Sequence, residues 1–129
     1  MHAVDTNVIV RYLTGDHPQQ YARARGLIDT APIYAATTVL LETEWVLRTA
    51  YGFTPEAMAR ALRGFAGLPT VTVQAPAQLK KALDWLEAGI DMADALHLAA
   101  AEGCDSFASF DRDLAKVANR VANIAVRAP

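Results

Sequence analysis

Four carboxylic acids of this chain stand beside apolar runs of sequence, where an ionised carboxylate is costly. They are Asp5, Glu42, Asp94 and Asp111. A charge near a core destabilises the fold unless it is paired, hydrogen-bonded or bound to a cation. Since the four acids are far apart in the chain but have similar neighbours, we expect their carboxylates to converge on one shared cation.

Such a site predicts hydrolysis of phosphodiester bonds. Oxygen ligands favour Mg²⁺ or Mn²⁺ over zinc or copper. Four acids can hold one or two such ions, and ions about 3.5–4 Å apart activate water and stabilise the leaving oxygen. No serine triad, phosphate-binding loop or glycine-rich dinucleotide loop competes with this interpretation.

The three aspartates also have a structural interpretation, because acids cap helices. Asp5 can cap a helix that begins near Val8. Asp94 follows Asp91 by three residues, as in a capping box. Asp111 precedes a helical run together with Asp113, so one of them is expected to cap and the other to bind a ligand, with Asp111 preferred for the site.

Glu42 and Glu44 lie close together but differ in their helical neighbours. Glu42 has no basic residue three or four positions away, which favours a functional role. Glu44 has Arg48 at the favoured i+4 position and is expected to form a surface ion pair, away from the site. His97 follows Asp94 by one helical turn, but no third zinc ligand is well spaced, so packing or a hydrogen bond is favoured.

Other conspicuous residues have simpler interpretations. Trp45 and Trp85 are expected in the core or in a subunit interface, and Cys104 as a small buried residue. The remaining acids considered fall at helix ends or polar faces and are expected to be solvated: Asp16, Asp29, Glu56, Asp84, Glu87, Glu102 and Asp105.

Short apolar runs alternate with helical patterns along the chain. Strands are expected at 1–4, 33–36, 71–73, 106–109 and 123–126. Helices are expected at 8–13, 18–29, 38–51, 55–65, 76–88, 92–102 and 112–119. Their starts are indicated by the segments Asp16–Pro18 and Thr54–Glu56, by Thr37 or Thr38 and by Asp91, and their stops by Gly52, Gly89 and Gly103.

This alternation predicts an α/β fold in three layers, an α/β/α sandwich with a central parallel sheet of about five strands. With 129 residues, the chain is expected to form one domain over residues 1–129. Ligands bind such sheets at the carboxyl ends of the strands. Asp5 and Asp111 immediately follow strands and so lie at the expected edge.

Composition restricts the partners. The net charge is −2, so electrostatics alone would not hold a nucleic acid, and bound metal or local arginines must supply positive charge. The candidate arginines are Arg11, Arg23, Arg25, Arg48 and Arg112. No apolar run approaches the roughly 18 residues that span a bilayer. One cysteine and no signal-peptide pattern favour a cytoplasmic protein.

Two other acidic sites on parallel sheets fit poorly. A haloacid-dehalogenase-like phosphatase would need a second aspartate where Asn7 stands. A phospho-receiver domain would need a lysine after a late strand, whereas the three lysines, Lys80, Lys81 and Lys116, are expected on helices.

The sequence resembles the PIN domain family, and in particular its VapC-like toxin ribonucleases. Four segments carry the resemblance, in order and at usual distances: Asp5–Leu13, Leu41–Arg48 with Tyr51–Phe53, Asp94–Ala101 and Ser109–Leu114. Asp5, Glu42, Asp94 and Asp111 match the acidic quartet, and Asp5 and Asp94 its principal metal ligands. Thr6 and Ser109 match hydroxyl-bearing positions, with Asn7 as a further supporting residue. Ser109 replaces the commoner threonine and Met92 a common aromatic.

The resemblance implies a Mg²⁺-dependent endoribonuclease, with Mn²⁺ as a possible substitute, that acts as the toxin of a type II toxin–antitoxin pair. It also implies a homodimer and a cognate antitoxin that covers the active site. A PIN nuclease of RNA processing or decay would have the same chemistry, and a small DNA-binding protein encoded upstream would favour the toxin. A non-catalytic binding module is disfavoured because the quartet is complete.

Overall fold

The computed structural model describes residues 1–129 as two compact units, Met1–Pro76 and Ala77–Pro129. The chain is an α/β protein, as predicted, and all its strand pairs are parallel. The five expected strands exist, but they form a sheet of three and a sheet of two. This arrangement is consistent with the α/β/α fold expected of a PIN-like chain. No helix has both the length and the apolar character needed to cross a membrane.

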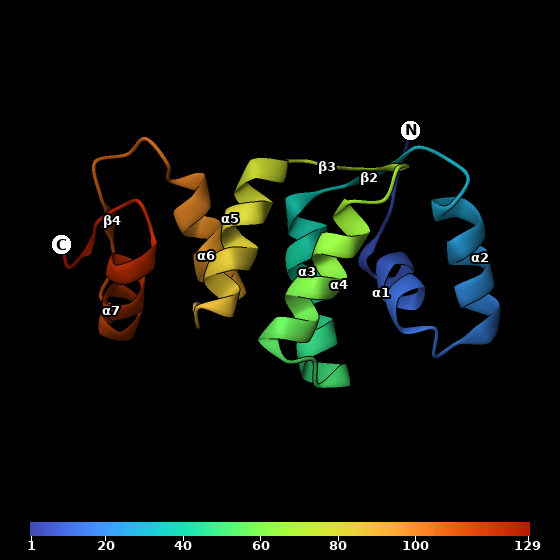
Figure 1. The fold of residues 1–129 in the computed structure, drawn as a ribbon, viewed down its shortest axis with the longest axis horizontal. Helices are drawn as coiled ribbons and strands as arrows, with labels where there is room; N and C mark the ends of the chain where they lie inside the picture. The colour runs from blue at the N-terminus through green and yellow to red at the C-terminus, as the bar shows by residue number, and fades with distance from the viewer. The chain divides into compact units, whose positions relative to one another are not determined.

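The first unit contains the larger sheet and four helices (Figure 1). Its elements are β1 (His2–Ala3), α1 (Thr6–Thr14), α2 (Pro18–Ile28), β2 (Ile33–Ala35), α3 (Thr37–Tyr51), α4 (Pro55–Ala66) and β3 (Val71–Val73). The strand order is β1-β2-β3, with His2 opposite Ile33 and Ile33 opposite Val71. Parallel strands must be joined by a long crossover, which usually contains a helix. Both connections in this sheet contain a pair of helices and so meet this requirement.

Local signals explain the limits of these helices. His17 caps α2 by accepting a hydrogen bond from the Gln20 amide, and Thr54 caps α4 in the same way, each followed by proline. Gly52 ends α3 with a φ of 68°, a left-handed conformation that glycine adopts without strain. The predicted threonine cap of α3 is wrong, because Ala36 stands at the cap position and makes no side-chain bond.

Helix packing in the first unit fixes the position of α1. This helix packs against both α2 and α3, and α3 also contacts α4. Ile9 of α1 is completely buried, as are Ile28 and Leu47. Burial of one such side chain stabilises the fold by about 1.5–3 kcal/mol. The start of α1, where Asp5 and Thr6 stand, is therefore held by a well-packed core.

The second unit contains the smaller sheet and the remaining helices. Its elements are α5 (Pro76–Glu87), α6 (Met92–Ala100), β4 (Phe107–Ala108), α7 (Arg112–Val121) and β5 (Val126–Arg127). Phe107 pairs with Val126, and the Asn119 side chain bonds both the amide and the carbonyl of Val126 at 2.9 Å. These bonds fasten β5 to α7.

The expectations about large or reactive side chains have different outcomes. Trp85 is buried, as expected for a core residue, whereas Trp45 is 56% exposed, which excludes the core and leaves its placement in a subunit interface a prediction. Cys104 is exposed, so its predicted burial is wrong. Cys104 lies after α6, in a turn that begins at Ala101. The path of the chain through this turn, rather than the hydrophobicity of the side chain, decides that Cys104 is exposed.

Candidate active site

Asp5 occupies the junction between β1 and α1. It is the cap of α1, and its Oδ1 accepts a hydrogen bond from the Thr6 amide at 2.7 Å. The side chain is exposed, and Oδ2 has no protein partner. Asp5 therefore performs the capping role and still offers one carboxylate oxygen to a ligand.

Thr6 joins the first acid to the second. Its buried hydroxyl donates a hydrogen bond to Oε1 of Glu42, which lies on α3. Glu42 is exposed, and its Oε2 has no protein partner. Thr6 thus fixes an exposed carboxylate next to Asp5, although 36 residues separate Thr6 from Glu42.

A cleft of about 340 Å³ contains this pair of acids. Asp5, Thr6 and Glu42 line it together with Arg11 and Tyr51. We call it the acid cleft. It is open to solvent and brings two carboxylates, a hydroxyl and a guanidinium within reach of one small ligand.

In the second unit, Asp94 lies within electrostatic range of two other acids. Burial and the charges of Asp91 and Asp111 raise the pKa of the Asp94 carboxyl, while His97 acts in the opposite direction. Asp94 makes no hydrogen bond, so it does not complete a capping box; Asp91 alone caps α6, through the Ala93 amide at 3.1 Å. Asp94 is thus available to a cation.

Asp111, and not Asp113, caps α7. Its Oδ1 accepts a hydrogen bond from the Leu114 amide at 3.0 Å. Its own amide donates to Oγ of the half-buried Ser109, also at 3.0 Å. The predicted ligand is therefore also the cap, and Ser109 fixes its backbone.

Each unit thus holds two members of the predicted quartet. Asp5 and Glu42 share the acid cleft of the first unit, and Asp94 and Asp111 interact electrostatically in the second. Neither unit by itself groups three acids, histidines or cysteines in a metal-binding arrangement. Convergence of all four acids stays a prediction.

The apolar sequence around the acids did not predict their burial. Asp5, Glu42 and Asp111 are exposed, and Asp94 is half-buried. The reason is geometric: a cap lies outside its helix, and neighbours in a helical sequence point in different directions.

Glu44 reverses its expected role. It is the most buried charged residue, with 2% exposure, so the predicted surface pair is wrong in its location. The predicted partner is correct, because Arg48 Nε lies 2.9 Å from Glu44 Oε2. The two glutamates are two positions apart on α3, about 200° around the helix, and so face opposite ways.

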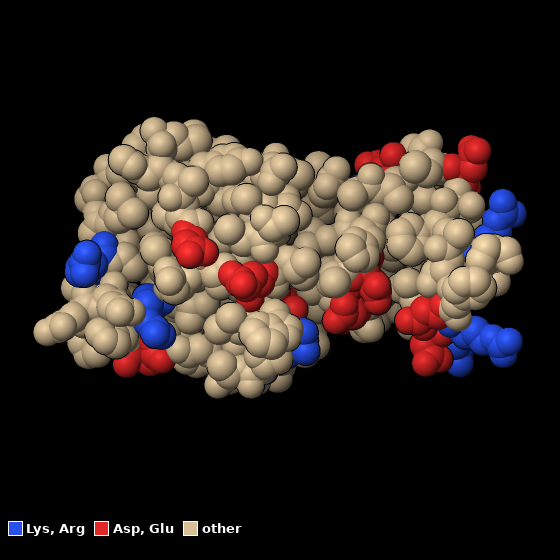
Figure 2. Space-filling model, turned by 180° about the vertical axis from the view of Figure 1, so that it is seen from behind, with Lys and Arg blue, Asp and Glu red and all other residues tan.

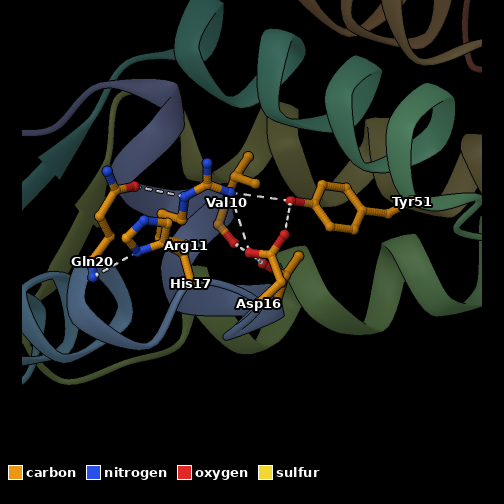
Figure 3. Close-up of polar contacts among 7 residues, drawn as sticks. Val10, Arg11, Asp16, His17, Gln20 and Tyr51 are labelled. Atoms are coloured by element: carbon orange, nitrogen blue, oxygen red, sulfur yellow. Dashed lines mark hydrogen bonds and ion pairs between the residues drawn. The ribbon is translucent and has the colours of Figure 1, made fainter.

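Sequence reasoning missed a polar network beside the acid cleft (Figure 3). Nη1 of Arg11 donates to Tyr51 at 3.1 Å and to Asp16 at 3.2 Å, and Nε donates to Gln20 at 2.7 Å. The Tyr51 hydroxyl donates to Asp16 at 2.5 Å. Arg11 and Asp16 are close in the sequence, but Tyr51 is 35 residues from Asp16, and the resemblance that includes Tyr51–Phe53 assigned Tyr51 no contact with either residue.

The face drawn in Figure 2 carries its charged side chains in small groups, and its lysines and arginines form no continuous basic patch. This distribution agrees with the net charge of −2. Any polyanion must therefore be held by a few arginines or by bound cations.

A comparison with known families identifies the chain. The family model described as "PIN domain" matches residues 3–120 and so runs through both units. The chain belongs to the PIN domain family. PIN domains are generally nucleases and typically use divalent metal ions, so this PIN chain is expected to act on nucleic acid with such ions. No curated protein matches the chain.

The donor set of this PIN domain fits a hard divalent cation. Asp5 and Glu42 each present a carboxylate oxygen without a protein partner, and Asp94 forms no hydrogen bond at all. Carboxylate oxygens are preferred by Mg²⁺ and Mn²⁺. A bound cation would also offset the burial and the acidic neighbours that raise the pKa of Asp94.

Proposed function

We propose that this PIN domain is a Mg²⁺-dependent endoribonuclease that acts as the toxin of a toxin–antitoxin pair. The proposal assigns Asp5, Glu42, Asp94 and Asp111 to one metal site, with Thr6, Asn7 and Ser109 in support. Mn²⁺ is expected to substitute for Mg²⁺. The observation that carries it is the acid cleft, where Thr6 fixes Glu42 beside Asp5 at the end of a parallel strand.

The side chains of this chain have distinct parts in the proposed reaction. Asp5 and Asp94 would be the principal ligands, and Glu42 and Asp111 would complete the set. When bound there, Mg²⁺ supplies activation of water and stabilisation of negative charge on phosphate oxygens. Thr6 holds Glu42 by its hydroxyl, and Ser109 holds the backbone of Asp111. Fixed ligands reduce reorganisation during the reaction.

The decisive experiment measures cleavage of total RNA by purified protein. Wild type should cleave with Mg²⁺ or Mn²⁺ and stop with EDTA. Asp5→Asn keeps the helix cap but removes a ligand charge, so cleavage should fall by orders of magnitude, and Asp94→Asn should act likewise. Glu56→Gln and Asp105→Asn are matched controls on exposed acids of each unit and should cleave like wild type. Cleavage that persists in EDTA, or an active Asp5→Asn protein, would contradict the proposal.

The toxin role adds a homodimer and a cognate antitoxin, in the cytoplasm. The exposed Trp45 on α3 is compatible with a protein interface, because aromatic residues are enriched there. Light scattering of the purified protein should give the dimer mass at micromolar concentration. Induction of the protein in cells should arrest growth, and co-expression of a small protein encoded beside it should restore growth. If growth continues although active protein is abundant, the toxin role is wrong and the nuclease activity alone is retained.

A further inference from the structure

A second cleft of the first unit lies beside the acid cleft. It has a volume of about 410 Å³ and is formed by side chains of α1 and α2. Asn7, Arg11, Gln20 and Arg23 provide its polar lining, and Leu27 contributes to its apolar lining. We call it the arginine cleft. Asn7 and Arg11 line both clefts, so the two clefts adjoin at α1.

Three side chains hold the guanidinium of Arg11, which lines both clefts (Figure 3). Gln20, Asp16 and Tyr51 occupy its Nε and Nη1 hydrogens, as described above, and leave Nη2 without a protein partner. A guanidinium that is fixed in this way offers directional donors at little further entropic cost. Since Asp16 Oδ1 lies 3.2 Å from Nη1 and offsets part of the positive charge, Arg11 contributes direction more than net charge.

Arg23 supplies the uncompensated charge of the arginine cleft. It is exposed and has no hydrogen bond or ion pair. Arg25, two residues later on the same helix, is instead bound to Asp29 at 3.0 Å and to Tyr21 at 3.3 Å. Of these two arginines, only Arg23 is therefore free to bind an anion from outside.

We propose that the arginine cleft binds a backbone phosphate of single-stranded RNA, next to the phosphodiester that is cleaved beside Asp5 and Glu42. Arg23 neutralises this phosphate, and Nη2 of Arg11 donates a hydrogen bond to it. The side chain of Leu27 contacts the attached sugar or base. The assignment rests on the proposed function, because it makes the two neighbouring clefts one track for a single strand.

The lining of the two clefts favours a polynucleotide over an acidic protein segment. A nucleic acid carries a phosphate on every nucleotide, so one strand can present an anion to Arg23 and another to a cation at the acids. A peptide presents anions at regular spacing only where acidic residues recur along its sequence. Leu27 also provides an apolar surface for a sugar or a base beside the charged groups.

Binding of a fluorescein-labelled RNA decamer tests the role of Arg23. The full chain carries Asp94→Asn so that the RNA stays intact, and fluorescence anisotropy is measured in Mg²⁺ over a range of KCl concentrations. Arg23→Gln should weaken binding about five- to tenfold and reduce the slope of log K against log[KCl] by about 0.7, the value for one phosphate of a single strand. Arg60→Gln is the matched control, because Arg60 is also an exposed helical arginine without a partner but lines neither cleft.

Cleavage kinetics separate this inference from the proposed function. In the otherwise wild-type chain, Arg23→Gln should raise KM with little change in kcat, as expected when binding of ground state and transition state is lost equally. If the wild type cleaves RNA but Arg23→Gln and Arg60→Gln have equal affinities and salt slopes, the arginine-cleft assignment is wrong and the nuclease proposal stands. If the wild type neither binds nor cleaves RNA, both are wrong. Arg23-dependent binding of a deca-glutamate peptide, without Arg23-dependent binding of RNA, would show a protein-docking cleft and overturn the inference.

Discussion

Thr6 offers a direct way to change the position of Glu42 without changing either acid. Replacement by valine keeps the shape of the side chain and removes only the hydroxyl that bonds Glu42. A hydrogen bond to a charged group stabilises a fold by about 1.5–3 kcal/mol. Since Glu42 is exposed, water can replace the lost donor, so we expect a loss near the lower limit, about 1.5 kcal/mol.

Thr6→Ser is the matched control for this prediction. It keeps the hydroxyl but removes a methyl group from a side chain that is only 6% exposed. That change should cost about 0.8 kcal/mol, a stability loss of the same order as for valine. Activity should nevertheless differ: kcat/KM of Thr6→Ser should stay near wild type, while that of Thr6→Val should fall by roughly tenfold, the equivalent of 1.4 kcal/mol.

Urea denaturation and RNA cleavage together test whether Thr6 positions Glu42. Stability is measured by circular dichroism without metal, and kcat/KM is measured with Mg²⁺ on the same preparations. A Thr6→Val protein that is destabilised but cleaves as well as Thr6→Ser would refute the idea that Thr6 positions Glu42. Equal losses of activity in both variants would point to a purely structural role of Thr6.

Three further predictions follow from the charged residues. Arg48→Met should destabilise the fold by about 3 kcal/mol, because it leaves the Glu44 carboxylate, with 2% exposure, without its partner. Glu44→Gln should destabilise the fold less. Urea denaturation measures both losses of stability, and equal losses would contradict the reasoning. Burial and acidic neighbours disfavour the ionised form of Asp94 and raise the pKa of its carboxyl in the folded state above the ordinary 3.8. The metal-free protein should therefore lose stability as the pH rises from 3.8 through this higher folded-state pKa. Asp94→Asn should remove this loss, Mg²⁺ should reverse it in the wild type, and denaturation between pH 4 and 7 would detect both effects. Trp45→Glu on the exposed face of α3 should convert a homodimer into monomers in light scattering, and an unchanged mass would exclude this face from the interface.

Local sequence signals determined most of the secondary structure. The pairs His17-Pro18 and Thr54-Pro55 start helices as predicted, and Gly52 ends one, because caps and φ preferences act within a few residues. The β3 strand Val71–Val73 has its predicted limits. Alternation of strands and helices was enough to predict a parallel α/β fold, although it did not reveal that the strands pair in sheets of three and two.

Side-chain environment was decided only by the tertiary structure. The sequence marked Glu42 and Glu44 as different, and correctly paired Glu44 with Arg48, because that contact lies within one helical turn. It could not tell that Glu44 is buried and Glu42 exposed, since burial depends on which elements cover each face of α3. The bonds of Glu42 to Thr6 and of Tyr51 to Arg11 and Asp16 span at least 35 residues, and only packing of α1 against α3 creates them. The residue types therefore determined which chemistry is available to this protein, and the folded chain determined where two of the acids and a fixed arginine meet.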